Sequence, residues 1–223
     1  MTGAVTVLFN TDRFLIKQFQ LFKKYVYADF IVCDNSTDVQ ASNRIQSYAS
    51  QNGIRYIKTY FEERDSSRSH GMALNEVYKE LRDKYNILGF FDHDLFPIQG
   101  FDINDLMKDK VIAGVPQIKG AVTYLWAGLV ILNNDQIDKT AVDFMPSTID
   151  GVGVDTGGEL NKIWKHLPPD KYHFFAERPN DDVTRIYYDL VKEEPLFLHW
   201  RNGSNWANEA TYEQRIDRLM QTI

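Results

Sequence analysis

Two carboxylates one residue apart, Asp92 and Asp94, directly follow the apolar run 87–91. A continuous hydrophobic run of this length is typical of a strand that is covered on both faces of a sheet. Charges at the end of a buried strand are costly unless they are paired, hydrated or bound to a cation. Carboxylate oxygens suit Mg²⁺ or Mn²⁺, whose remaining coordination positions are filled by phosphate oxygens and water. The pair therefore predicts a divalent metal site that a phosphate-bearing ligand can approach.

The position of this pair matters more than its spacing. A chain of this length and charge content should contain roughly one Asp-x-Asp by accident, so the spacing alone is weak support. The pair follows a hydrophobic strand and precedes Pro97, which favours a functional turn. His93 lies between the two aspartates and is counted here with the residues expected to contact the bound phosphate ligand.

His199 ends another apolar run, 196–198, and precedes Gly203 and Ser204. An imidazole suits Mn²⁺ better than Mg²⁺, and a Gly-Ser turn offers backbone N–H groups to a phosphate. A lone histidine is also commonly structural, so the residues alone leave both roles open. The five histidines and one cysteine lack the spacing of a zinc site.

The elements that must position these residues alternate along the chain. Apolar runs predict strands, and apolar residues spaced by three and four predict helices with caps at Asp12 and within 34–38. The predicted strands are 4–9, 30–33, 54–57, 87–91, 111–115 and 127–132, and the predicted helices are 12–26, 38–51, 70–85 and 101–110. This order predicts an α/β fold whose mostly parallel sheet is flanked by helices.

The remainder of the chain has a weaker pattern. Asn133 to Asp135 can cap a helix, and the glycine-rich segment 150–159 is expected to lead into a helix through Trp164. Beyond Pro168 and Pro169 the chain is expected to be irregular until a charged helix ending at Ile223. No repeat or linker divides residues 1–223, which predicts one domain.

Polar residues follow the first two strands as well. In an open α/β sheet, ligands bind beyond the carboxyl ends of the strands, so Asn10, Thr11 and Asp34 are expected to share a crevice with Asp92. Asp34 can accept hydrogen bonds from a ribose or a base, or it can cap the helix that follows. Arg68, at the expected start of a helix, can contact a phosphate or be a surface arginine. Asp155 can be a catalytic carboxylate or a helix cap.

The composition excludes several classes of protein. A net charge of −6 and a pI near 5.4 speak against a nucleic-acid binder. No apolar run approaches the roughly 20 residues that cross a bilayer, and the N-terminus has no basic region before an apolar core. The single Cys33 excludes an internal disulfide and indicates a reducing compartment. We therefore expect a cytoplasmic enzyme without a membrane span.

Together these residues resemble the GT-A class of nucleotide-sugar-dependent glycosyltransferases, in particular small bacterial and algal-virus enzymes, over nearly the whole chain. Asp92-His93-Asp94 is similar to the DxD motif, which in that class binds Mn²⁺ or Mg²⁺ and the donor diphosphate. The resemblance gives the following residues roles: Asp34 at the nucleoside, Arg68 and His70 beside the donor, Trp126 and Gly128 along the sugar pocket, Asp155 near sugar and acceptor, and His199 with Gly203 at the metal and diphosphate.

The resemblance implies transfer of a sugar from a nucleoside diphosphate sugar, expected to be UDP-linked, to a hydroxyl of a glycan or glycoprotein. The acidic pair of an inverting enzyme is absent from 155–159, which favours retention of configuration. Two alternatives are a nucleotidyltransferase that makes an activated sugar and a non-catalytic module that binds nucleotides or carbohydrates.

Overall fold

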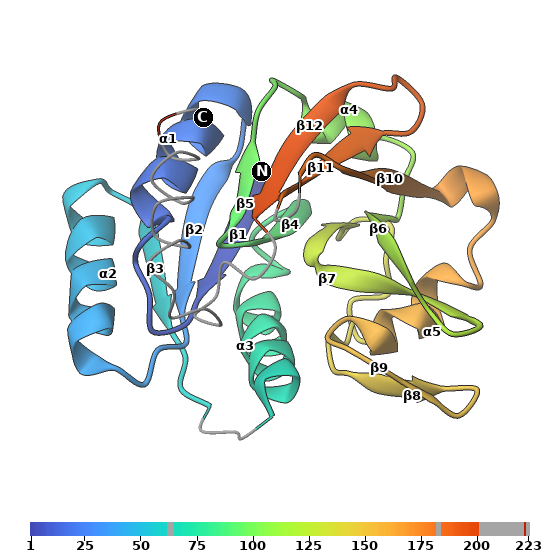
Figure 1. The fold of residues 1–223 in the computed structure, drawn as a ribbon, viewed down its shortest axis with the longest axis horizontal. Coiled ribbons are helices and arrows are strands. Elements are labelled where there is room, and N and C mark those ends of the chain that lie inside the picture. Colours follow the sequence, from blue (N-terminus) through green and yellow to red (C-terminus); the bar gives the residue numbers. More distant parts are fainter. Residues whose placement is uncertain (62–64, 182–183, 201–220, 222–223) are drawn as a thin grey trace.

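The structure is a computed structural model that describes residues 1–61, 65–181, 184–200 and 221. The first half of the chain alternates strands and helices: β1 (Thr2–Leu8), α1 (Leu15–Tyr25), β2 (Asp29–Asp34), α2 (Val39–Gln51), β3 (Arg55–Lys58), α3 (Ser66–Leu81) and β4 (Ile87–Asp92). β1, β2, β3 and β4 pair in parallel, as the alternating sequence pattern predicts. Figure 1 shows α1, α2 and α3 grouped around this half of the sheet.

The second half adds antiparallel strands. It contains β5 (Leu95–Pro97), α4 (Ile103–Met107), β6 (Ile112–Lys119), β7 (Val122–Asn133), the hairpin β8 (Ser147–Ile149) and β9 (Val152–Val154), the 3-10 helices η1 (Gly158–Leu160) and η2 (Pro169–Lys171), α5 (Asn161–Trp164), β10 (Tyr172–Pro179), β11 (Thr184–Asp189) and β12 (Pro195–Trp200). The sheet order is β3-β2-β1-β4-β7-β6-β10-β11-β12-β5. The α/β class and the mixed sheet flanked by helices are confirmed.

The order of the strands determines where the two aspartates lie. Only two residues separate β4 from β5, yet β5 pairs antiparallel with β12 at the far edge of the sheet. The sheet must therefore curl until its last strands reach the end of β4. This curl brings a C-terminal strand next to Asp94.

Apolar side chains cover both faces of the sheet. Because side chains alternate along a strand, Val5 and Val7 pack with α3, whereas Ala4 packs with α1 and α4 on the opposite face. Leu8 and Val32 pack under α1 and α2. The sheet is thus held rigidly at the strands whose carboxyl ends carry the polar residues.

Four local expectations are wrong. α1 begins after Phe14 without a side-chain cap, because Asp12 forms an ion pair with Arg44. α3 starts four residues earlier than expected, at Ser66, because Asp65 accepts hydrogen bonds from the first turn. Asn133 ends β7 and Asn134 and Asp135 lie in the turn after it, so this segment caps no helix. The segment after Pro169 is not irregular but forms β10, β11 and β12, whose antiparallel partners were not apparent from local pattern. The expected helix ending at Ile223 lies outside the described residues, apart from Gln221.

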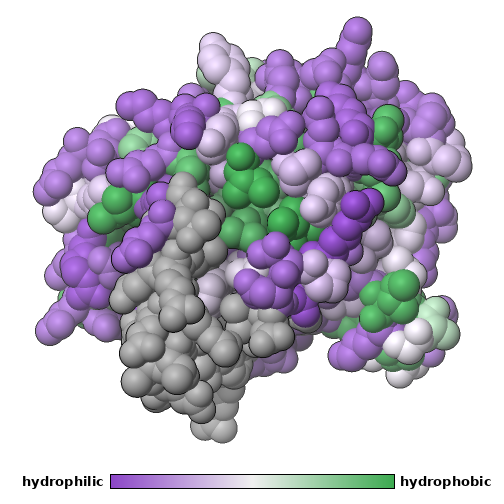
Figure 2. All heavy atoms as spheres, turned by 45° about the horizontal axis from the view of Figure 1, so that its top comes forward, coloured by the Kyte–Doolittle hydropathy of each residue, from purple (hydrophilic) through white to green (hydrophobic). Residues whose placement is uncertain are grey.

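The surface is largely polar. Figure 2 shows a mainly hydrophilic face with a smaller hydrophobic area toward its centre. Among the described residues, exposed large apolar side chains include Leu190 and Val191 between β11 and β12. Isolated exposures of this kind are common on folded proteins. No helix in the described part of the chain is both long enough and apolar enough to cross a membrane.

Candidate active site

Asp92 and Asp94 lie on the turn that joins β4 to β5. β4 is buried between β1 and β7; its pairing with β1 extends to Asp92 and its pairing with β7 to Phe91, so sheet hydrogen bonds fix the backbone that leads into the turn. The carbonyl oxygen of Asp94 accepts a hydrogen bond from the N–H of Trp200 at 2.9 Å, which ties the turn to β12. The carboxylates are therefore presented by rigid strands rather than by a long loop.

Asp92 faces β7 and α3. Its Oδ1 lies 3.7 Å from Nε2 of His70 on α3. On β7, a Cβ atom at Gly128 would lie 2.5 Å from Oδ2 of Asp92 and would overlap the ring of Trp126. Glycine is thus required at this position because the carboxylate and the indole ring occupy the space that a side chain would need. Asp92, His70, Trp126 and Gly128 come together as the resemblance implies.

Asp94 faces His199. The pairing of β5 with β12 sets His199 opposite Leu95, and Nε2 of His199 lies 3.5 Å from Oδ1 of Asp94. His199 is buried and packs against Trp126, with ring centroids 4.7 Å apart, and its Nδ1 lies 3.0 Å from the hydroxyl of Tyr187. With Nδ1 engaged by Tyr187, Nε2 is directed at the carboxylate.

The two carboxyl groups differ in proton affinity. Burial raises the pKa of Asp92 above its ordinary value, and the neighbouring charge of Asp94 adds to this rise against the opposing effect of His70. Burial also acts on Asp94, but His199 outweighs it and holds the pKa of Asp94 below its ordinary value. Like charges held in a buried turn are stabilised by a nearby cation.

The metal prediction can be tested against these positions. Within the described ranges, no group of three His, Cys, Asp or Glu side chains is gathered closely enough to hold a metal ion. Two suitable atoms do approach: Oδ1 of Asp94 and Nε2 of His199 are 3.5 Å apart. In an octahedral shell with bonds of about 2.1 Å, neighbouring ligand atoms lie about 3 Å apart. An oxygen and an imidazole nitrogen at this separation fit Mn²⁺, with Asp92 on the preceding strand end.

The residues expected at the nucleoside form hydrogen bonds with neighbouring residues of the protein. The carboxylate of Asp34 is fully buried and accepts hydrogen bonds from Ser42, Tyr56 and Lys58 side chains. Burial alone would raise its pKa, but hydrogen bonds from the side chain and backbone of Ser36 and from the side chains of Ser42 and Tyr56 hold the pKa of Asp34 below its ordinary value. Asp34 therefore shapes the loop after β2 in this conformation.

Asn10 also supports that loop. Its backbone adopts a positive φ of 53°, and its Oδ1 accepts hydrogen bonds from the N–H groups of Thr37 and Asp38 at 2.8 Å each. Thr11 accepts a hydrogen bond from the N–H of Arg13. These contacts place Asn10 and Asp34 on neighbouring strand ends, as expected, and use them to connect the loops after β1 and β2.

Arg68 lies in the first turn of α3 and is exposed. Deeper in this helix, Asn75 binds the segment that follows β7: its amide donates to Asp143 at 2.7 Å and accepts from the N–H of Phe144 at 2.9 Å. The later turns of α3 thus hold the segment 143–144, which follows β7 in the chain.

Asp155 directly follows β9 and lies near Tyr124 of β7. Its carboxylate is exposed and accepts a hydrogen bond from the N–H of Thr156 at 2.7 Å. Burial raises the pKa of Tyr124 on β7, and the nearby charge of Asp155 raises it further. Tyr124 is two residues from Trp126 and therefore on the same face of β7. Gly203 and Ser204 lie outside the described residues.

Two residues of this region escaped the sequence analysis. Tyr187 is buried and contacts His199, but it lies in a part of the chain expected to be irregular. Gln18 is buried on α1 and binds the backbone around Asp94. A glutamine three residues after Leu15 and four before Phe22, on the apolar face of a helix, was a usable signal.

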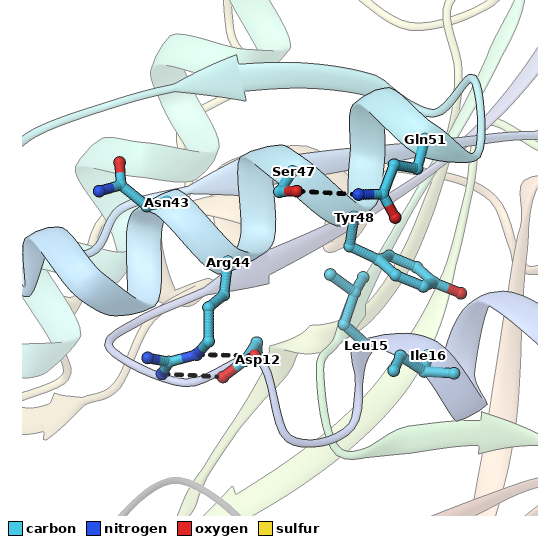
Figure 3. A pocket seen from close by; sticks show the side chains of 8 residues that line it. All are labelled: Asp12, Leu15, Ile16, Asn43, Arg44, Ser47, Tyr48 and Gln51. Atoms are coloured by element: carbon cyan, nitrogen blue, oxygen red, sulfur yellow. Dashed lines mark hydrogen bonds and ion pairs between the residues drawn. The ribbon is translucent and has the colours of Figure 1, made fainter.

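A surface pocket of about 380 Å³ lies elsewhere, between α1 and α2. Figure 3 shows Asp12 and Arg44 joined at its edge and Tyr48 beside Leu15 and Ile16. The Asp12–Arg44 pair is bidentate, with distances of 3.0 and 3.1 Å. None of the residues predicted to bind the donor or the metal lines this pocket.

No family model and no curated protein matches the sequence. Solved structures do match. The mannosyltransferase PcManGT from Pyrobaculum calidifontis, in complex with GDP-Man and Mn²⁺, aligns with a TM-score of 0.51 at 11% identity over 80% of this chain and 57% of that chain. The glycosyltransferase GlyE of Streptococcus pneumoniae TIGR4 aligns with a TM-score of 0.49 at 15% identity over 79% and 46%, respectively. A197 from STIV aligns with a TM-score of 0.40 at 11% identity over 93% and 97%.

These similarities concern the fold. The match to PcManGT shows that the chain has the GT-A fold of nucleotide-sugar glycosyltransferases, as the resemblance in sequence implied. The chain spans about half the length of PcManGT and GlyE, with 57% and 46% of those chains covered. Activity and substrates must therefore be argued from this chain's own residues.

Proposed function

We propose that this protein is a metal-dependent glycosyltransferase. It would transfer a sugar from a nucleoside diphosphate sugar to a hydroxyl group of a glycan or glycoprotein. The observation that carries the proposal is the meeting of Asp92, Asp94 and His199, from strands far apart in sequence, at the carboxyl end of the central strand of a GT-A fold. This is where ligands bind in open α/β sheets.

Asp94 and His199 would hold Mn²⁺ or Mg²⁺. Asp92 and the donor diphosphate would supply the remaining ligands of the metal. When bound, the metal would supply charge stabilisation for the leaving diphosphate. The mannosyltransferase with the same fold was determined with GDP-Man and Mn²⁺, which supports a sugar nucleotide and a divalent metal as the ligands to test.

The other predicted residues would act around this centre. His70, which lies 3.7 Å from Asp92, and Arg68 on the same helix would contact the donor, and Trp126 with Gly128 would border the sugar. The exposed carboxylate of Asp155 would orient the acceptor or stabilise positive charge on the reacting sugar carbon. We propose a UDP-linked donor and retention of configuration, with Gly203 and Ser204 assisting the diphosphate.

Mn²⁺-dependent release of nucleoside diphosphate from a panel of UDP- and GDP-sugars tests this proposal. We expect turnover with at least one donor, and a fall of roughly 10²- to 10³-fold in Asp94→Ala, the range seen when one preorganised electrostatic contact is lost. Asp109→Ala, which removes an exposed carboxylate remote from the site, should retain activity.

The same assay separates the alternatives. A nucleotidyltransferase would instead release pyrophosphate from a nucleoside triphosphate and a sugar phosphate. A binding module would be stabilised thermally by a donor with Mn²⁺ but would never release the nucleotide. Either pattern, or activity that survives in Asp94→Ala, would contradict the proposed function.

A further inference from the structure

Gln18 is a polar side chain buried inside the apolar layer between α1 and the sheet. Its side chain is 0% exposed, and it lies on the same helix face as Leu15, Leu21 and Phe22, which are also buried. A long amide at such a position loses its hydration and side-chain entropy on folding. Its hydrogen bonds therefore indicate what it does there.

The amide of Gln18 holds both ends of the turn that carries Asp94. Nε2 donates one hydrogen bond to the carbonyl oxygen of Asp92 at 2.7 Å and another to that of Leu95 at 2.9 Å. Both partners are acceptors, so only the NH₂ end of the side chain can satisfy them, and both of its hydrogens are used. The orientation of the amide is thus set by the hydrogen-bond network.

The opposite end of the amide has no such partner. Oε1 of Gln18 is buried without a hydrogen-bond partner among the described residues. An unsatisfied buried acceptor is destabilising, so the side chain is poorly suited to a purely packing role. A leucine or methionine would fill the same space without that cost but would leave the two carbonyl groups unbonded.

We propose that Gln18 is a positioning residue of the metal site. By joining the carbonyl oxygens of Asp92 and Leu95, it fixes the backbone of the turn and hence the direction of the Asp94 carboxylate toward His199. The outer shell of a metal site orients its ligands in this way. This inference rests on the proposed function, because it assigns Gln18 a role toward the metal proposed there.

Direct Mn²⁺ binding to the full chain tests the inference without turnover, because free hexaaqua Mn²⁺ is measured by electron paramagnetic resonance. We expect Gln18→Met to bind Mn²⁺ roughly 10- to 100-fold more weakly than wild type, the range found for outer-shell residues. The matched control is Gln20→Met, the same substitution at an exposed position of the same helix. It should bind Mn²⁺ as wild type does.

A second variant keeps the test possible if Gln18→Met does not fold. Gln18→Glu keeps the length of the side chain and can supply one donor when protonated, so it should bind Mn²⁺ with intermediate affinity. A cooperatively folded Gln18 variant that binds Mn²⁺ within about twofold of wild type would overturn the inference alone. Failure of both variants to fold cooperatively would also overturn it, since the amide would then serve the fold as a whole. Absence of Mn²⁺ binding by wild type would overturn the proposed function and the inference with it.

Discussion

β2 and β4 both end in an aspartate, but the two carboxylates have opposite surroundings. Asp34, at the end of β2, is fully buried and accepts hydrogen bonds from Ser42, Tyr56 and Lys58. Asp92, at the end of β4, has Nε2 of His70 at 3.7 Å from its Oδ1 and Asp94 as a like-charged neighbour. The pKa of Asp34 is accordingly lowered and that of Asp92 raised.

The difference separates a structural carboxylate from a candidate ligand. A carboxylate whose oxygens are already satisfied stabilises its own loop, whereas a carboxylate held near another negative charge is suited to bind a cation. Two aspartates at equivalent strand ends therefore lead to different expectations, and three substitutions test the comparison.

The largest effect is expected at Asp92. Asp92→Asn keeps the shape of the side chain and removes one of two neighbouring like charges, so the metal-free protein should be at least as stable as wild type. Mn²⁺-dependent donor cleavage should nevertheless fall by roughly 10²- to 10³-fold. Urea unfolding and a nucleotide-release assay measure the two quantities. A variant that lost stability but kept its activity would remove the contrast with Asp34.

A smaller effect is expected at Tyr187. Tyr187→Phe deletes the hydroxyl 3.0 Å from Nδ1 of His199 and leaves the stacked ring in place. Without this partner the imidazole loses the hydrogen bond that orients its ring, so Mn²⁺ should bind roughly 10- to 100-fold more weakly. Tyr188→Phe, on the adjacent residue of β11, is the matched control. Unchanged Mn²⁺ affinity in Tyr187→Phe would argue that His199 is structural.

The smallest effect, on stability rather than activity, is expected at Asp34. Asp34→Asn replaces an acceptor by a donor facing Lys58 and should lower the free energy of unfolding by about 1–3 kcal/mol at pH 7, with kcat nearly unchanged. The folded pKa lies below the ordinary value of 3.8, so the stabilisation by the charged form is present above that value and lost as the pH falls through the lowered pKa.

Unfolding experiments across pH check the sign of this effect. The stability difference between wild type and Asp34→Asn should stay constant from neutral pH down to about 5 and shrink below about 4. A difference that instead grew on acidification would mean that burial, rather than hydrogen bonding, dominates at Asp34. Strong loss of donor cleavage in a stable Asp34→Asn protein would support the nucleoside contact that the sequence suggested.

The local pattern predicted the elements that depend on neighbouring residues. Hydrophobic runs and helical spacing identified β1, β2, β4 and the three long helices, because burial of a periodic face is encoded within one segment. The helix cap predicted within 34–38 was also correct, since Asp38 caps α2. The alternating order of these elements was enough to predict the α/β class.

The strands after Pro169 could not be predicted in this way. β10, β11 and β12 are stabilised by pairing with each other and with β6 and β5, so their partners lie far away in sequence. Which aspartate caps a helix was equally hard to predict, because its partner can also lie far away in sequence. Asp12 and Asp65 are both plausible caps, but Arg44 engages the first, and only the second caps its helix.

The sequence by itself determined the fold class, the strand end that carries Asp92 and Asp94, and the chemistry that such a pair favours. Only the tertiary structure decided that Asp34 is satisfied internally, that His199 reaches Asp94, and that Gln18 and Tyr187 support the turn and the imidazole. The physical reason is that residue type and periodicity encode burial, whereas the partners of a buried polar group are set by the curl of the sheet and its long-range strand pairing.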